Sequence, residues 1–247
     1  MIDLIVTNTN KRIRRINIDR KNDDLKEVDE IEILAYIGLQ YMRGMLGLNG
    51  HDVCQLFAPI IGPPGFGATM SKNRFKFLHA CINFDDQDSR EERWKKDKFA
   101  AIREFFELFN DNCSKHIIPE QYLAIDETLY GMRNRISFKQ YNPSKPAKYG
   151  LLFKSSNATG YSYTYTSIPY CGKPLASFTD FDLPYYVSGT ENTVKYLVDK
   201  LSRYTDLQGR NISFDRLYTS IPLARWLLEI LHVLVQFNQT EKIFQLI

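Results

Sequence analysis

The chain has 247 residues, enough for one large domain or two modest ones. Hydrophobic residues make up 44% of it, as is usual for a folded protein with a buried core. The net charge of +3 is too small to indicate nucleic-acid binding on its own. No run approaches the ~18 apolar residues of a membrane span, and no apolar run of signal-peptide length occurs near the start. We therefore expect a soluble, intracellular protein.

The cysteines indicate a reducing compartment, because they are scattered and form no Cys-x-x-Cys pair. Two His/Cys pairs have a spacing found in zinc sites, but a structural zinc needs four convergent ligands. Both pairs lie in or beside helical patterns, where a small buried Cys is common, and we interpret them so. The residues concerned are Cys54, Cys81, Cys113 and Cys171, with His51 and His116.

The first half of the chain has a helical pattern. Apolar residues recur at helical spacing over residues 31–45, and another apolar stripe covers 99–113. Ser71 is placed to cap a helix that continues to Ile82. The Gly- and Pro-rich segment 59–67 is expected to be a loop, and it lacks the Gly-Lys-Ser/Thr ending of a phosphate loop. The acidic cluster at 85–92 is expected to be a solvated loop.

The pattern changes near residue 122, where short apolar or alternating runs predict strands. Two of these strands form a hairpin through a turn at 157–160. Helices with one apolar face then alternate with further strands, which predicts a mixed α/β sheet. The same element order is that of the ribonuclease-H-like fold, in which the first and fourth strands are neighbours. The expected elements are strands at 123–126, 149–154 and 161–166, a helix at 191–201, a strand at 211–215, a helix from 222 and a strand at 232–237.

Two aspartates stand at the ends of the first and fourth expected strands. They are Asp126 and Asp215, and adjacency of the two strands would bring their carboxylates together. Mg²⁺ prefers such hard oxygen ligands, although a single Asp after a strand is most often a turn residue. Glu127 is expected to point to the opposite face of the sheet and not to be a co-ligand.

The motifs around both aspartates resemble those of piggyBac transposases. The first motif comprises LAIDETLYGMRNR (123–135) and QYNPSKPAKYG (140–150). The second comprises NISFD (211–215) and YTSIPLA (218–224). Upstream, ILAYIG (33–38), SKNRF (71–75) and FDD (84–86) resemble the helical N-terminal region of the family.

The resemblance implies a ribonuclease-H-like core that cuts and rejoins DNA at TTAA targets with Mg²⁺ or Mn²⁺. It places the first two catalytic, metal-binding aspartates of the family at Asp126 and Asp215. The third family aspartate lies in a later Gly-Gly-Val-Asp-like segment. After Asp215 the only acidic residues are Glu229 and Glu241, and neither matches that position.

A basic segment follows the first aspartate. Six Lys or Arg and no acidic residue occur over 133–154, and aromatic residues are interspersed among them. Lys and Arg neutralise phosphates, so we predict DNA contact, with a solvated hairpin as the alternative. The candidate DNA-binding residues are Arg133, Arg135, Lys139, Lys145 and Lys148.

These observations lead to one main hypothesis and two alternatives. We expect a helical dimerisation or DNA-binding region at 1–118 and a C-terminally incomplete ribonuclease-H-like core at 119–247. The main hypothesis is a nuclear, transposase-derived protein that binds double-stranded DNA and forms a homodimer, without full cut-and-paste activity because the third aspartate is absent. The alternatives are an active metal-dependent transposase and a non-catalytic dimerisation module that acts on full-length relatives.

Overall fold

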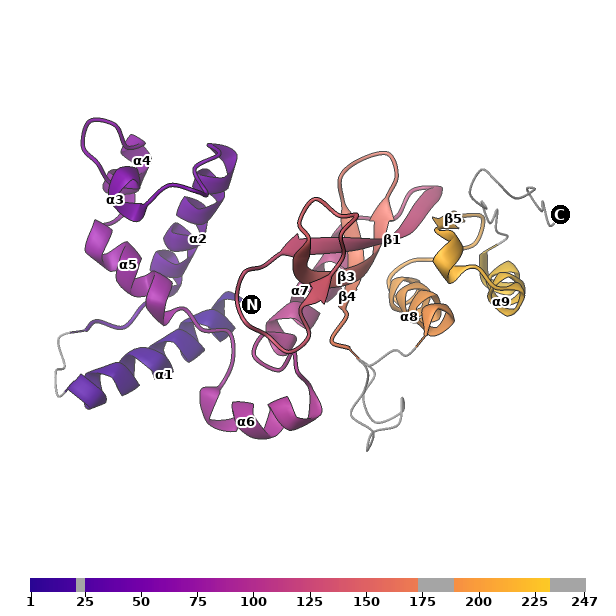
Figure 1. Ribbon diagram of the computed structural model, residues 1–247, viewed down its shortest axis with the longest axis horizontal. Helices are drawn as coiled ribbons and strands as arrows, with labels where there is room; N and C mark the ends of the chain where they lie inside the picture. Colours follow the sequence, from indigo (N-terminus) through magenta and orange to yellow (C-terminus); the bar gives the residue numbers. More distant parts are fainter. Residues whose placement is uncertain (21–24, 173–188, 232–247) are drawn as a thin grey trace. The chain divides into compact units, whose positions relative to one another are not determined.

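The computed structural model describes residues 1–20, 25–172 and 189–231 (Figure 1). The chain divides into two compact units, one of residues 1–91 and 101–105 and the other of residues 92–100 and 106–247. Within the described ranges, no helix is both long and apolar enough to cross a membrane. The functional division predicted at residue 118 stays a prediction.

The first unit is helical and has its own core. Its inward-facing residues come from helices far apart in sequence, and they include Ile5, Ile33, Phe66 and Phe75, each at most 1% exposed. The rings of Phe66 and Phe75 lie 6.2 Å apart. The helices are α1 (Ile2–Arg20), α2 (Glu30–Met45), α3 (Val53–Leu56), α4 (Pro64–Thr69) and α5 (Lys72–Cys81), as Figure 1 shows.

Capping residues explain where these helices begin. The Ser71 hydroxyl accepts a hydrogen bond from the Arg74 amide at 3.2 Å, so the predicted cap of α5 is confirmed. The expectation of an uninterrupted loop over 59–67 is wrong, since α4 begins at Pro64. Proline suits the first helical position because its φ is preset and its missing N–H is not needed there.

The acidic cluster at 85–92 is not the solvated loop expected from its composition. Residues from Gln87 onward belong to helix α6 (Gln87–Lys96). Asp85 is only 1% exposed and forms an ion pair with Arg90. Because a buried carboxylate is costly unless it is paired, the Arg90 guanidinium is what allows Asp85 to lie inside the fold.

The second unit is built on a five-stranded mixed sheet in which β3 occupies a central place. One end of β3 pairs with β2, the other end pairs with β4, and its opposite edge pairs with β1, all antiparallel. The far edge of β1 pairs with β5 in parallel. The strands are β1 (Tyr122–Gly131), β2 (Gln140–Tyr141), β3 (Tyr149–Ala158), β4 (Thr164–Pro169) and β5 (Asn211–Phe214).

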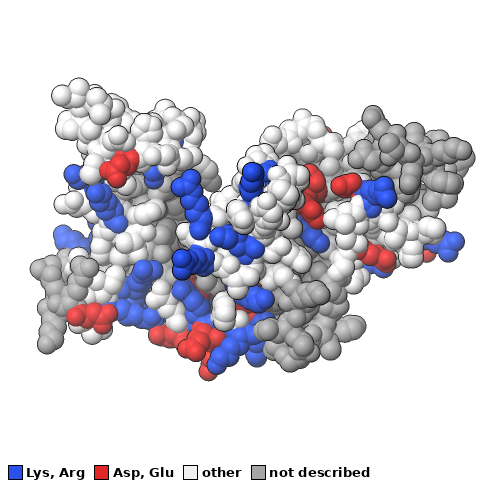
Figure 2. Space-filling view, viewed as in Figure 1, with Lys and Arg blue, Asp and Glu red and all other residues white. Residues whose placement is uncertain are grey.

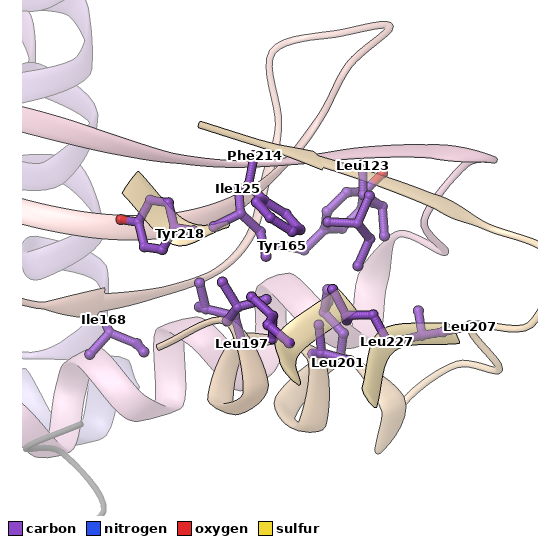
Figure 3. Close-up of a cluster of buried hydrophobic side chains, with 14 residues drawn as sticks. Leu123, Ile125, Tyr165, Ile168, Leu197, Leu201, Leu207, Phe214, Tyr218 and Leu227 are labelled. Carbon is purple, nitrogen blue, oxygen red and sulfur yellow. The ribbon is translucent and has the colours of Figure 1, made fainter. Parts of the chain in front are cut away.

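Helices pack against this sheet and bury its inward side chains. On one face, α8 (Thr190–Ser202) and α9 (Ile221–Leu231) bury Leu197, Leu201 and Leu227 against the inward side chains of β1, β4 and β5 (Figure 3). Helix α7 (Arg103–His116) packs beside α8, where Glu107 accepts from the Lys200 ammonium at 3.2 Å, and its Phe106 ring lies 5.5 Å from that of Phe153 on β3. The sheet and these helices thus share one core.

The mixed α/β class and the helical N-terminal region are confirmed, and so is the adjacency of the first and fourth expected strands. Three strands differ clearly in extent. β1 continues to Gly131 because the residues after Asp126 pair with β3. β3 continues to Ala158 instead of 154, and β4 begins at Thr164 instead of 161. The strand expected at 232–237 lies outside the described residues.

Candidate functional site

The parallel pairing of β1 with β5 determines where the two aspartates lie. Its register aligns Leu123 with Ile212 and ends with Ile125 opposite Phe214. The next residue on each strand is an aspartate, Asp126 on β1 and Asp215 just past β5. Parallel strands end at the same edge of a sheet. The two aspartates therefore follow aligned residues of neighbouring strands at that edge.

Each aspartate also has a local backbone partner. The Asp126 carboxylate accepts a hydrogen bond from the Glu127 amide at 2.7 Å. The Asp215 carboxylate accepts one from the Arg216 amide at 2.6 Å and caps the short 3₁₀ helix η1 (Arg216–Tyr218). Both aspartates are exposed, so the carboxylate lone pairs that accept no backbone hydrogen bond are accessible to solvent.

A buried phenol, that of Tyr218, belongs to the segment that follows Asp215. Tyr218 is 1% exposed, and its hydroxyl donates a 2.7 Å hydrogen bond to the Glu127 carboxylate. Burial raises the pKa of the Tyr218 phenol, and the hydrogen bond to Glu127 raises it further. The charges of Asp126 and Asp215 also raise this pKa, which means that both aspartates act on the same phenol.

A half-buried cation of β3 lies beside Tyr218 on the α8 side of the sheet. Lys154 on β3 aligns with Glu127, and its ammonium donates to the Thr193 hydroxyl at 3.3 Å. The ammonium also lies 5.6 Å from the centre of the Tyr218 ring. Burial lowers the pKa of Lys154, while the charge of Glu127 raises it. Glu127 is therefore engaged in a polar cluster on the α8 side of the sheet.

The donor set suits Mg²⁺ or Mn²⁺ held by two carboxylates. Magnesium is commonly bound by one or two carboxylates, with water and substrate phosphate completing the octahedron. In the part of the chain that the structure describes, no group of three or more His, Cys, Asp or Glu side chains is arranged to hold a metal. Two carboxylates alone leave most positions of an octahedral ion to water and phosphate.

The predicted basic residues lie on the hairpin that joins β1 to β3. Lys145 contacts the strand of the first aspartate, because its ammonium donates to the Glu127 carbonyl at 2.9 Å. The Lys139 ammonium donates to the Asn134 carbonyl at 3.3 Å. Arg133, Arg135 and Lys148 are exposed. Figure 2 shows basic side chains and a small acidic group on the same visible face of the sheet-bearing unit.

Exposed tyrosines stand among these cations. Tyr141 and Tyr149 are 58% and 55% exposed, and their ring centres lie 4.7 Å apart. The Lys139 ammonium lies 5.7 Å from the Tyr149 ring. Together with Arg133, Lys139 and Tyr149 line a hollow of about 560 Å³. Cations beside exposed aromatic rings form a surface that suits nucleic acid.

Comparison with known proteins identifies the family. A family model described as Transposase IS4 matches residues 1–234. A solved structure, the cryo-EM structure of a piggyBac transposase synaptic complex with hairpin DNA, matches 98% of this chain with a TM-score of 0.78 and 29% identity. The chain belongs to the piggyBac-type transposase family. The resemblance seen in the motifs is confirmed.

Two human relatives of this piggyBac-type chain are also similar to it. They are PiggyBac transposable element-derived protein 3 and the chimeric ERCC6-PGBD3 protein, each 28% identical over 106 residues. The match covers 43% of this chain, 17% of the first relative and 10% of the second. The chain also covers 48% of the solved piggyBac chain. It therefore spans less than half the length of each of these proteins.

Sequence reasoning missed three members of the site in this piggyBac-type chain. Tyr218 was noted only as part of a motif, Lys154 only as a basic residue, and Glu127 only as a side chain on the far face. The hydrogen bond between Tyr218 and Glu127 spans 91 positions, and no local pattern reports such a contact.

Proposed function

We propose that this piggyBac-type chain is a transposase-derived, DNA-binding protein that holds Mg²⁺ or Mn²⁺ between Asp126 and Asp215. The observation that supports it best is the β1–β5 register, which ends one residue before each aspartate. The topology of the sheet also agrees with a ribonuclease-H-like core, in which the first and fourth strands are neighbours.

The basic hairpin has the features expected of a phosphate-binding element. None of its five candidate cations pairs with a carboxylate of the described residues, so their charge is available to DNA. The bond from Lys145 to the Glu127 carbonyl holds this cation beside the aspartates. A DNA strand contacting Lys145 would therefore bring a phosphate close to the two carboxylates.

These positions indicate a separate role for the aspartates and for the basic residues. Asp126 and Asp215 supply hard oxygen ligands, and the basic residues orient the phosphate backbone. The bound ions would polarise the scissile phosphodiester and lower the pKa of an attacking water. The solved relative is a transposase bound to hairpin DNA, which supports duplex or hairpin DNA as the ligand class.

The extent of catalysis is a second part of the proposal. These 247 residues contain two carboxylates that match the family pattern, and a third would have to come from outside them. We propose that this polypeptide alone binds transposon-end DNA in the nucleus but does not complete cut-and-paste transfer. The alternative, an active transposase, requires metal-dependent nicking by these residues that disappears in Asp126→Ala.

Mobility shifts on duplex DNA test the basic hairpin. A plot of log affinity against log salt concentration has a negative slope. In the variant with Lys145→Ala and Lys148→Ala, this slope becomes shallower by about 1.8, and affinity falls about 50-fold near 0.1 M salt. The physical reason is counterion release: with each phosphate contact that is lost, about 0.9 fewer counterions leave the DNA on binding.

A matched control removes the same charge elsewhere in the second unit. Lys95 and Lys96 are exposed neighbours on α6, so Lys95→Ala with Lys96→Ala changes net charge equally without touching the hairpin. We expect its salt slope to stay close to that of the unaltered chain. Equal losses in the two double variants would show that overall charge, and not the hairpin, drives binding.

An exposed apolar stripe favours the homodimer as a second candidate function. Ile31, Leu34, Tyr41 and Met45 lie on the outer face of α2 and are 78%, 48%, 71% and 87% exposed. With Gly38, they alternate at spacings of three and four residues, the repeat of a coiled-coil seam. Added atoms at Gly38 would meet nothing within 4 Å, so another helix could approach there. We propose that α2 pairs with α2 of a second copy.

Sedimentation velocity tests this pairing. At tens of micromolar, the unaltered chain is expected to sediment as a dimer, and Tyr41→Glu with Met45→Glu as a monomer, because charge cannot be buried at the seam. Ile60→Glu with Ile61→Glu is the control, since both residues are exposed in the same unit but lie outside α2. A monomeric unaltered chain would contradict the proposal.

A further inference from the structure

The two aspartates stand where the regular pairing of their strands has ended. The last aligned pair is Ile125 with Phe214, after which β1 continues along β3 and the other segment turns into η1. Ladder hydrogen bonds between β1 and β5 therefore stop before the site. A metal held by two carboxylates needs their separation to be maintained by some other contact.

One hydrogen bond joins the two segments beyond that point. The Tyr218 hydroxyl donates to the Glu127 carboxylate at 2.7 Å. Glu127 is bonded directly to Asp126, and the Tyr218 amide donates to the Asp215 carbonyl at 2.9 Å. Together with the aligned pair Ile125 and Phe214, this hydrogen bond closes a ring of contacts that contains both aspartates.

Both ends of this hydrogen bond are fixed by packing. The Tyr218 ring belongs to the same buried cluster as Ile125 and Phe214, and Figure 3 shows its hydroxyl pointing away from that cluster. On the other side, Glu127 aligns with Lys154, whose ammonium also lies over the Tyr218 ring. Because neither group can move independently, the hydrogen bond between them fixes the position of the Asp126 segment relative to the Asp215 segment.

We infer that Tyr218 and Glu127 form a positioning pair that keeps Asp126 and Asp215 at the separation a divalent cation requires. The pair touches the ligand segments from the α8 side of the sheet and does not itself contact the metal. This inference rests on the proposed metal site and adds the residues that preorganise it.

Mn²⁺ binding to the whole chain, followed by electron paramagnetic resonance, tests the pair. Tyr218→Phe keeps the buried ring and removes the hydroxyl, and we expect Mn²⁺ affinity to fall about tenfold, the usual scale of a hydrogen bond to a charged group. Tyr165→Phe is the matched control, since Tyr165 is fully buried in the same cluster and its hydroxyl bonds to Tyr161 at 3.0 Å. Its Mn²⁺ affinity should stay unchanged.

A second variant distinguishes the bond from the charge. Glu127→Gln retains an oxygen that can accept from Tyr218 but carries no charge, so Tyr218→Phe should weaken Mn²⁺ binding about tenfold in the unaltered chain and only about threefold in the chain that carries Glu127→Gln. If Tyr218→Phe has no effect in either background while Asp126→Asn still removes binding, the metal site stands and the positioning pair is wrong. Equal losses in Tyr218→Phe and Tyr165→Phe also overturn it, because they would reflect general loosening of the core.

Amide hydrogen exchange provides a readout that does not depend on metal. In Tyr218→Phe, exchange at Glu127 and Thr219 should accelerate about tenfold relative to Tyr165→Phe, since the link between the segments is gone. Unchanged exchange overturns the pair whether or not Mn²⁺ binds. Failure of the unaltered chain to bind Mn²⁺, with accelerated exchange in Tyr218→Phe, overturns the metal role of the pair together with the proposed site.

Discussion

Replacing Asp126 and Asp215 together by asparagine is expected to lower the affinity of the chain for Mn²⁺ at least about 100-fold, because even loss of outer-shell partners typically costs 10- to 100-fold. Asparagine has the same shape but lacks the charge that a hard cation requires. Isothermal titration of the chain with Mn²⁺ measures the change directly. Each single replacement should cause a smaller but clear loss.

The asparagine variants should fold normally. Each aspartate accepts a backbone hydrogen bond, from Glu127 and from Arg216, and an asparagine side-chain carbonyl can accept the same bond. Asp206→Asn is the matched control, since its carboxylate is also exposed and also accepts a local backbone bond, from the Gln208 amide at 3.0 Å. It should leave Mn²⁺ affinity unchanged. Unaltered Mn²⁺ binding in the Asp126→Asn, Asp215→Asn variant would show that the metal site is elsewhere.

The adjacency of the two aspartates could be predicted because it depends on topology. A parallel neighbour needs a crossover, and α8 between β4 and β5 carries the apolar face that such a connection requires. The extent of β1 could not be predicted in the same way. Beyond Asp126 its side chains are exposed or half-buried, so the hydrogen bonds to β3, and not hydrophobicity, continue the strand.

Polar contacts between side chains were the other part that could not be predicted from the sequence. The burial of Asp85 follows from Arg90 folding over it, and composition alone indicated a solvated segment. The hydrogen bond between Tyr218 and Glu127 likewise joins residues 91 positions apart that meet only in the folded chain. Periodic patterns report which face of an element is buried, but they do not report which polar groups meet across the fold.

The second large expected effect is a loss of stability when the core between α8 and the sheet is altered. Leu197→Ala should lower the free energy of unfolding by about 3 kcal/mol, within the 2–5 kcal/mol typical of a fully buried leucine, because it leaves a cavity between α8 and the sheet. Urea denaturation followed by the fluorescence of Trp226, which packs against this core, measures the loss. Asp199→Ala, on the exposed side of the same helix, should change stability by less than ~0.5 kcal/mol.

This variant also separates stability from metal binding. Leu197 packs in the cluster of Ile125 and Phe214, the residues just before the two aspartates, but it does not belong to the ring closed by Tyr218 and Glu127. Without denaturant, a domain with the usual 5–15 kcal/mol of stability stays folded after a loss of about 3 kcal/mol. Folded Leu197→Ala should therefore bind Mn²⁺ as the unaltered chain does. A loss of Mn²⁺ affinity as large as that in Tyr218→Phe would mean that the core as a whole, and not one hydrogen bond, sets the separation of the aspartates.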